Sequence, residues 1–300
     1  MSVTAAMPTD VPRAPQSPGA VALRRLLRHG NFRIGGTILG LIILAAIVGP
    51  WLWPLDPASQ DLGHRLAVPV WSAKGTWLHP FGTDQLGRDY LARLLQGARV
   101  SLTIGFLTVL LSGVIGTGLG VAAGYFGGRI DVAINFLITI RLTLPVVLVA
   151  LVVVAVYGGS LPTLIVVIGL LLWDRFAVVT RSATQQLASR DFIISAQAIG
   201  SSIPRILFVE LLPNLIGPLV VVATIELAHA VLLEAALSFL GLGVKPPLSS
   251  WGLMVAEAKN QLLFRPWMIA IPGTPLVALV LAINLVGDAI RDAVAADGRA

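Results

Sequence analysis

Six long apolar runs constrain the fold of this chain more than any other feature of its sequence. They cover roughly residues 34–53, 102–124, 135–157, 161–179, 215–240 and 268–287. An α-helix needs about 20 predominantly apolar residues to cross the hydrocarbon core of a bilayer. Helices and closed barrels are the only structures that satisfy every backbone polar group there. The sequence therefore predicts an all-α membrane protein with about six transmembrane helices.

The composition excludes several other classes of protein. Hydrophobic residues make up 56% of the chain and charged residues 12%, whereas soluble domains carry about 25% charged residues. A cytosolic enzyme or a disordered scaffold is therefore excluded, and membrane lipid is the expected environment. The 21 Lys and Arg exceed the 15 Asp and Glu only slightly and form no basic run, so no nucleic-acid partner is expected. The absence of Cys excludes thiol catalysis and Cys-based zinc sites.

The distribution of the runs predicts five segments. Residues 1–30 are expected to be a disordered cytoplasmic tail, because they are rich in Pro, Ala and Ser without periodicity. Residues 31–55 form the first transmembrane anchor, which starts too late and is too long for a signal peptide. An external loop with a short helix is expected over 56–100. The core domain, with the other five transmembrane helices, occupies 101–292, and a C-terminal tail follows over 293–300.

Positive charge predicts the orientation of the chain. Cytoplasmic loops are enriched in Lys and Arg, and six crossings place both termini on one side. We therefore expect cytoplasmic termini, since four arginines precede or begin the first run: Arg24, Arg25, Arg28 and Arg33. Arginines in the outer loop oppose this orientation. They are expected to be neutralised in a short external helix, capped by Thr83 or Asp84, through two i,i+4 pairs, Asp84/Arg88 and Asp89/Arg93.

The segment 180–214 is long for a connection between spans and carries helix-ending signals. Asp191 is a candidate N-cap for a helix that ends at Gly200, and Ser202 with Pro204 starts a second helix that we expect to end at Pro213. Apolar side chains expected to be exposed are Phe192, Ile193, Ile199 and Ile206. Such a patch often marks a docking site for another protein. The alternative is an amphipathic helix resting on lipid.

The fifth run holds three ionisable residues, Glu226, His229 and Glu234. At 3.6 residues per turn they fall within an arc of about 140° on one helix face. Ionisable groups at membrane depth usually face protein or water and are candidates for function. We hypothesise that this face lines a translocation path or an interface with a partner subunit. The alternative is that Glu234 lies at the outer interface and Glu226 forms a structural pair.

The sequence contains no constellation of residues that predicts an enzyme. The glycines of the second run favour close helix packing. None of Lys74, Lys245 and Lys259 follows a glycine, so the phosphate-binding pattern G-x-x-x-x-G-K-[ST] is absent. Glu226 and His229 alone are too few ligands for a metal ion. We therefore expect a chain without catalytic residues and without a metal or cofactor of its own.

The hexapeptide from Ser195 to Gly200, with Leu212-Pro213 beyond it, resembles the cytoplasmic "EAA" loop of ABC importer permeases. Ile194 stands where the family often has Glu, and Glu210 where it often has His. By this resemblance the loop forms a coupling helix that inserts into a cleft of a separate ATPase subunit. The residues it assigns to coupling are Arg190, Asp191, Phe192, Ser195, Ala196, Ala198, Gly200 and Pro213.

Further motifs resemble the C-type subunits of dipeptide, oligopeptide and nickel permeases. They are the stretch HPFGTDQLGRD at 79–89, LSFLGLG at 237–243 followed by PP at 246–247, and NLVGDAIRD at 284–292. The outer signature residues are Gly82, Thr83, Asp84, Gly87, Arg88 and Asp89. The matches run in order along residues 30–292.

The resemblance implies a type I ABC importer permease fold in a bacterial inner membrane. It also implies four kinds of partner: a homologous second permease, two ATPase subunits that hold ATP and Mg²⁺, an external solute-binding protein, and lipid. Di- or oligopeptides are the expected cargo, with nickel, glutathione or another small solute as the alternative. An ion-coupled secondary transporter is the competing class. It usually shows internal repeats, and none is found between residues 34–157 and 161–287.

Overall fold

The computed structural model of the protein describes residues 26–297, and its regular elements are helices, as predicted. Most of the predicted N-terminal tail lies outside the described residues. The membrane-length candidates are five helices, or six if the bent pair α4 and α5 is one span. The elements are η1 (Leu62–His64), η3 (Lys259–Gln261), α2 (Gly30–Leu52), α3 (Tyr90–Phe126), α4 (Gly128–Thr143), α5 (Val146–Tyr157), α6 (Leu161–Leu171), α7 (Trp173–Ala188), α8 (Asp191–Ala198), α9 (Ile203–Arg205), η2 (Ile206–Leu211), α10 (Leu212–Phe239), α11 (Trp251–Ala258) and α12 (Trp267–Asp297).

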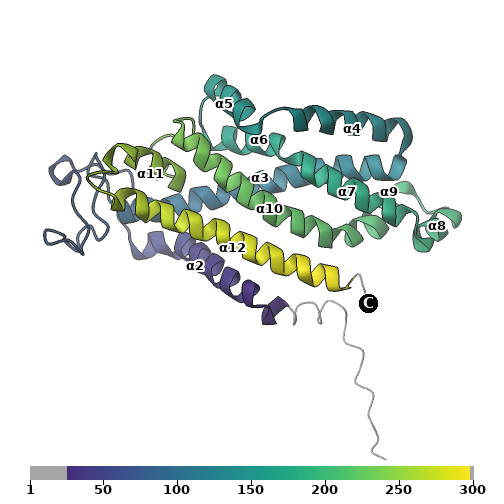
Figure 1. The fold of residues 1–300 in the computed structure, drawn as a ribbon, viewed down its shortest axis with the longest axis horizontal. Coiled ribbons are helices and arrows are strands. Elements are labelled where there is room, and N and C mark those ends of the chain that lie inside the picture. The colour runs from purple at the N-terminus through teal and green to yellow at the C-terminus, as the bar shows by residue number, and fades with distance from the viewer. Residues whose placement is uncertain (1–25, 298–300) are drawn as a thin grey trace, which may run out of the picture.

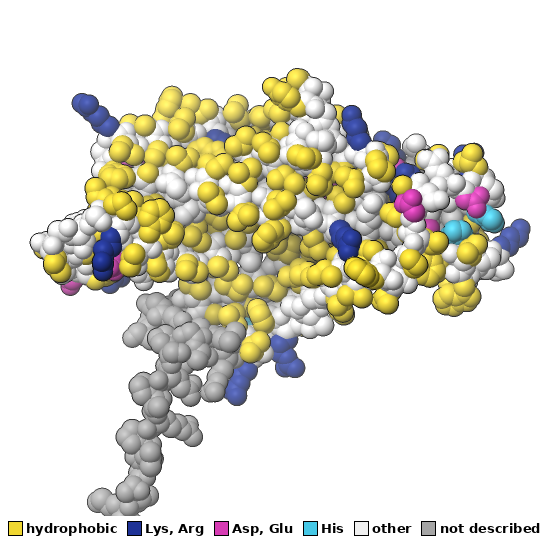
Figure 2. Space-filling model, turned by 180° about the vertical axis from the view of Figure 1, so that it is seen from behind, with side chains coloured by type: hydrophobic (Ala, Val, Ile, Leu, Met, Phe, Trp, Pro, Cys, Tyr) yellow, Lys and Arg dark blue, Asp and Glu magenta, His cyan; other side chains and the backbone are white. Residues whose placement is uncertain are grey.

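The long helices run along the long axis of the molecule (Figure 1). The segment between α2 and α3 lies at one end together with α11, and α8 lies at the opposite end. Both the start of α2 and the end of α12 point toward the α8 end. Apolar side chains cover most of the face in Figure 2, and the acidic side chains visible there lie toward its two ends. This distribution suits a bundle whose middle zone faces lipid or other apolar surfaces.

Glycines on α3 allow close contact with α7. A Cβ atom at Gly116 would lie 2.2 Å from the carbonyl oxygen of Trp173, and one at Gly120 would lie 2.6 Å from that of Ala177. No residue larger than glycine fits at such distances. The prediction that these glycines serve helix packing is therefore confirmed.

The third predicted span is bent rather than straight. The axes of α4 and α5 differ by 83°, and the break falls at Leu144 and Pro145, the N-cap of α5. Proline lacks an N–H donor, crowds the preceding turn and disfavours helical geometry in the residue before it. The prediction of one continuous helix over 135–157 is therefore wrong.

The prediction that a loop helix ends at Pro213 is also wrong. The chain is helical from Ile203 to Phe239, with a π-helical segment over Ile206–Leu211 directly before α10. Pro213 lies in the first turn of α10, where its missing N–H is tolerated. The wider π turn leaves room for a ring that would clash with a regular α-helix. The second loop helix and the fifth span therefore form one continuous rod.

The outer segment 83–89 forms a tight turn instead of the predicted short helix. An antiparallel bridge joins Thr83 to Asp89, and Gly87 adopts a φ of 76°. A Cβ atom at Gly87 would lie 1.7 Å from the carbonyl oxygen of Asp61, so only glycine fits there. The pair Asp84/Arg88 forms at 2.6 Å, but Asp89 N-caps α3 by accepting from the Ala92 N–H. The predicted pair Asp89/Arg93 is therefore wrong.

Candidate functional site

Helix α8 forms the tip of the molecule opposite the outer segment (Figure 1). It begins at Asp191, and Arg190 occupies the N-cap position without a side-chain hydrogen bond. The prediction of Asp191 as N-cap is therefore wrong by one residue. An acidic side chain in the first turn still interacts favourably with the positive end of the helix dipole.

Gly200 ends this helix as predicted. Its φ is 82°, the Gly200 N–H donates to the Gln197 carbonyl at 2.9 Å, and the Ser201 N–H donates to the Ala196 carbonyl at 3.0 Å. These two bonds form a Schellman motif, which favours glycine at the left-handed position. A Cβ atom at Gly200 would meet no other atom within 4 Å. The glycine therefore serves the backbone conformation and not close packing.

Burial divides the apolar side chains of this loop into two groups. Phe192 and Ile199 are exposed as predicted, Ile199 to 83%. Ile193 and Ile206 were expected to be exposed, but they are buried and pack with Leu211. The structure adds four exposed apolar side chains that the sequence analysis missed, Ile194, Ile203, Phe208 and Val209. The residues that the resemblance assigns to coupling are exposed, except for the half-buried Ala196.

A polar cluster joins α7 to α10 within their apolar spans. Arg175 Nη1 lies 3.2 Å from Glu226 Oε1 and 3.1 Å from His229 Nδ1. Glu226 is buried, while His229 is 41% and Arg175 54% exposed at the side chain. Helical periodicity predicts that Glu226 and His229 share one face of a helix, but it does not predict that Arg175 joins them. Periodicity within one helix carries no signal for a partner on another helix.

A second ion pair lies next to this cluster. Arg141 Nε of α4 is 3.2 Å from Asp174 Oδ1 of α7, and both side chains are largely buried. Arg141 also donates to the Leu171 carbonyl. Arg141 interrupts the third run and Asp174 the fourth, and these two charges are paired inside the protein, which avoids the cost of a lone charge facing lipid.

Glu234 does not share the exposed surface of the other two candidates. It is fully buried, and its Oε1 accepts hydrogen bonds from Ser238 Oγ at 2.6 Å and Ser250 Oγ at 2.7 Å. Ser250 also N-caps α11. Glu234 therefore connects α10 to α11, and its burial gives no support to a path-lining position.

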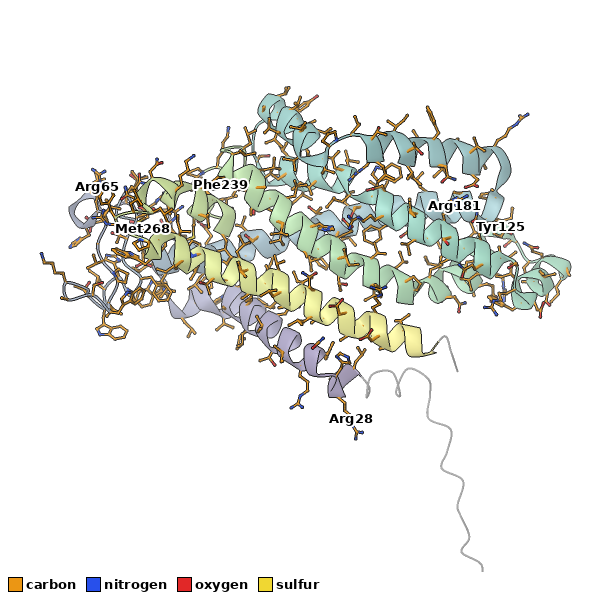
Figure 3. All side chains as sticks on the ribbon, viewed as in Figure 1. Arg28, Arg65, Tyr125, Arg181, Phe239 and Met268 are labelled. Atoms are coloured by element: carbon orange, nitrogen blue, oxygen red, sulfur yellow. The ribbon has the colours of Figure 1, made fainter. Side chains whose placement is uncertain are left out.

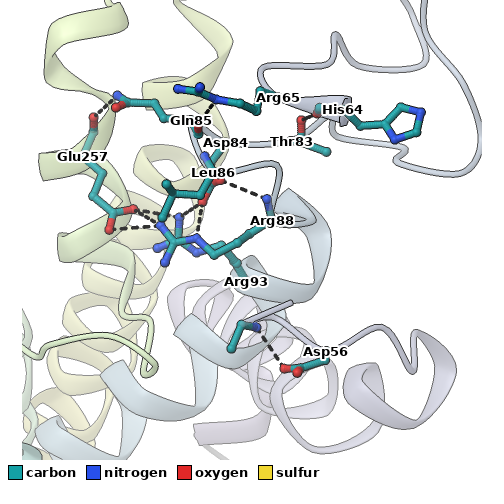
Figure 4. A network of polar contacts seen from close by, with 11 residues as sticks. Asp56, His64, Arg65, Thr83, Asp84, Gln85, Leu86, Arg88, Arg93 and Glu257 are labelled. Atoms are coloured by element: carbon teal, nitrogen blue, oxygen red, sulfur yellow. Dashed lines mark hydrogen bonds and ion pairs between the residues drawn. The ribbon is translucent and has the colours of Figure 1, made fainter. Parts of the chain in front are cut away.

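The outer signature residues hold the outer segment against the bundle (Figure 4). Asp84 Oδ2 is 2.5 Å from Arg93 Nη1 and 2.6 Å from Arg88 Nε. Glu257, in the last turn of α11, is 2.7 Å from Arg93 Nη1 and 3.2 Å from Arg88 Nη2. These four side chains connect the turn, the start of α3 and α11.

The remaining signature residues support this connection. Thr83 Oγ1 accepts from the Ala67 N–H at 2.9 Å. Asp89 accepts from Trp53 Nε1 at 3.0 Å and contacts His79 Nδ1 at 2.8 Å. Gly82 has a φ of 77°. Nearby, hydrogen bonds from His64 and the Gly63 N–H hold the pKa of Asp61 below its usual range.

The described residues contain no group of three or more His, Asp or Glu side chains that could hold a metal ion. The labelled side chains in Figure 3 mark the two ends of the bundle, with Arg65 and Met268 at the outer-segment end and Tyr125 and Arg181 toward α8. The exposed loop at one end and the polar cluster in the apolar zone are therefore the candidate functional features of this chain.

Comparison with known proteins agrees with this architecture. The family model described as "Binding-protein-dependent transport system inner membrane component" matches residues 116–298. The model described as "N-terminal TM domain of oligopeptide transport permease C" matches residues 17–69. The second match agrees with the resemblance to C-type subunits.

Relatives match along nearly the whole chain. The dipeptide transport system permease protein DppC of Haemophilus influenzae is 38% identical over 86% of this chain and 89% of its own length. The di/tripeptide transport system permease protein DppC of Pseudomonas aeruginosa is 39% identical over 88% of each chain.

A solved structure of the MetNI methionine ABC transporter, in an inward-facing conformation, shares the fold. It aligns with a TM-score of 0.55 and 21% identity, and covers 67% of this chain and 96% of its own. The predicted type I ABC importer permease fold is thereby confirmed. On these matches, the chain belongs to the family of binding-protein-dependent transport system inner membrane components, as a multi-pass permease of the ABC importer class.

Proposed function

We propose that this chain is one of two permease subunits of an importer in the bacterial inner membrane, with both termini in the cytoplasm. Two separate ATPase subunits bind ATP and Mg²⁺ and supply the energy. An external solute-binding protein delivers the cargo. This chain holds no cofactor and has no catalytic residue; its work is mechanical.

The exposed loop around α8 carries the proposal. Ile199 and Phe192 are exposed among residues 26–297, and an exposed apolar patch of this kind is typical of a docking surface. A turn at Gly200 separates α8 from the helical rod over Ile203–Phe239, but the buried Ile193 of α8 packs with Ile206 and Leu211 of that rod. That rod carries Glu226 and His229 in its apolar zone, so a displacement at α8 is transmitted directly to the polar cluster. This connection supports alternating access driven by the ATPase subunits.

Short peptides are the proposed cargo. The basis is the naming of relatives as dipeptide and di/tripeptide permease proteins. Nickel, glutathione or another small solute is the alternative. Growth of an amino-acid auxotroph on a dipeptide, in a strain without other peptide uptake systems, separates them: growth that requires this gene supports peptide import, and normally inserted protein without growth contradicts it.

Substitution of Ile199 tests the coupling proposal. Ile199→Asp places a charge in the proposed ATPase interface, and we expect loss of co-purification with the ATPase subunits and of ATP-dependent uptake. Leu263→Asp is the matched control, because Leu263 is 89% exposed in the segment between α11 and α12 at the opposite end. An Ile199→Asp variant that keeps its ATPase subunits as the control does contradicts the proposed docking role.

A further inference from the structure

Arg175 occupies an unusual position for a charged side chain. It lies in the span Leu161–Ala188, yet 54% of its side chain is exposed. Neighbouring exposed side chains on this span, Leu170 and Val178, are apolar. A guanidinium facing hydrocarbon costs several kcal/mol. In the working transporter this surface therefore faces water or another polar group.

The contacts of the Arg175 guanidinium with Glu226 and His229 are made through one of its three nitrogen atoms. Nη1 contacts Glu226 Oε1 and His229 Nδ1. Within residues 26–297, Nε and Nη2 of Arg175 have no hydrogen-bond partner. A guanidinium presents five N–H donors in a planar fork that matches both oxygens of a carboxylate. The free Nε–Nη2 edge of Arg175 is thus a preformed half of a bidentate pair.

Acidic side chains of the described chain do not occupy that edge. Asp174, the adjacent residue, is largely buried and pairs with Arg141. Glu226 is 1% exposed, and its Oε1 lies 3.2 Å from Nη1. An acceptor for this edge must therefore come from outside this part of the chain, and a carboxylate matches it in both charge and shape.

We propose that Arg175 binds the free carboxylate of the cargo during its passage through the permease. This inference rests on the proposed transport function and adds a contact point to it. Glu226 neutralises Arg175 when the path is empty, so the arriving carboxylate shares a guanidinium that is already paired. Shared pairing keeps the contact weak enough for release. His229, 41% exposed beside it, borders the same site.

Uptake by the complete transporter in proteoliposomes tests the contact. The cargoes are dialanine and dialanine amide, which lacks the carboxylate. We expect Arg175→Gln to lower dialanine uptake by about ten- to a hundredfold, the usual range for a lost charged hydrogen-bonding partner, and to leave amide uptake unchanged. Arg175→Lys should recover part of the dialanine uptake, since it keeps the charge but loses the fork. Arg181→Gln, in the same helix and paired with Asp131, is the control and should affect both cargoes equally.

Three results overturn the proposal. The first is an equal loss of uptake of both cargoes in Arg175→Gln, and the second is unchanged dialanine uptake in that variant. The third is loss of the second permease when the variant is purified, which would assign the carboxylate to the partner subunit. If the wild-type transporter moves neither cargo, the proposed peptide function fails and not only the Arg175 contact. If the solute-binding protein rejects the amide, the cysteine measurement below decides.

The absence of cysteine in this chain permits a second test that needs no transport. His229→Cys introduces a single reactive thiol into this chain. The rates at which an anionic and a cationic methanethiosulfonate reagent modify this thiol are measured in the purified complex. We expect the ratio of anionic to cationic reaction rates to fall by about fivefold when Arg175→Gln is added, because the guanidinium attracts the anion. Saturating dialanine should slow both reagents. An unreactive cysteine, or a ratio independent of Arg175, contradicts an anion-attracting, water-exposed site.

Discussion

Gly116 lies so close to α7 that any side chain at this position would overlap the backbone of that helix. The same holds at Gly120 and Gly124, so one face of α3 is set by steric fit to α7. Gly118 lies between them in sequence but points into open space, where a Cβ atom would meet nothing within 4 Å. Glycines of one helix therefore have different roles, and single substitutions distinguish them.

Gly116→Val is expected to destabilise the protein by about 2–4 kcal/mol, because the helices must separate to accept the side chain. Gly118→Ala is the control and should stabilise by about 0.5–1 kcal/mol through helix propensity. Unfolding of both variants in detergent measures the difference. Equal stability of the two variants would show that α3 and α7 are not packed this closely.

Ser250→Ala is expected to destabilise by about 2–4 kcal/mol, since it removes both the N-cap of α11 and a donor to the buried Glu234. Ser160, the N-cap of α6, is exposed, and its Oγ accepts a hydrogen bond from the Thr163 N–H at the surface. Ser160→Ala should therefore cost only about 0.5–1 kcal/mol. Comparison of the two thermal unfolding midpoints tests whether the bond to Glu234 contributes.

At the scale of elements, buried charge pairs connect helices that apolar contacts alone would not orient. Arg88, Arg93, Asp84 and Glu257 bring the outer turn, α3 and α11 together. In the rod through Ile203–Phe239, backbone geometry and not a charge pair joins the two elements. There a π segment accommodates a proline, so a loop helix and a spanning helix become one element.

Asp84→Asn tests the outer cluster. It leaves Arg88 and Arg93 with Glu257 as their remaining acidic partner, and we expect a loss of about 3–5 kcal/mol, as for other broken buried pairs. Asp56→Asn, at an exposed position in the same outer segment, should change stability by less than about 0.5 kcal/mol. Denaturant unfolding in detergent gives both values. A loss for Asp84→Asn no larger than for the control would contradict a structural role for the cluster.

At the scale of the whole molecule, the two candidate functional features lie at different depths of one bundle. The α8 loop forms one end, and the outer segment and α11 form the other (Figure 1). The Arg175 cluster belongs to the apolar spans Leu161–Ala188 and Ile203–Phe239. An importer subunit needs this separation, since energy enters at one end and cargo at the other.

The orientation is tested with single cysteines. A membrane-impermeant maleimide should label Leu263→Cys in intact spheroplasts, and Ile199→Cys only after the membrane is permeabilised. Both side chains are more than four-fifths exposed, at 89% and 83%. The reverse pattern would place the termini outside the cytoplasm. Protection of Ile199→Cys by the ATPase subunits would add support for docking at α8.

Local physics let the sequence predict the class of fold and the position of the loop. Runs of about 20 apolar residues require helices in a bilayer, and Gly200 acts through its own lack of a side chain. Gly200 ends α8 whatever surrounds it, because its left-handed conformation depends on the backbone alone. These features need no knowledge of distant residues.

Tertiary structure decided which charges meet and which apolar side chains remain exposed. Arg88 pairs with Glu257 across 169 residues of sequence, and Arg175 pairs with Glu226 from another helix. Helical periodicity ranks the faces of one element but contains no information on the element that packs against it. The burial of Ile193 and Glu234, and the exposure of Arg175, follow from that packing. The sequence by itself therefore determined the class of fold and the position of the loop around α8, and the packing between helices determined the candidate cargo contact.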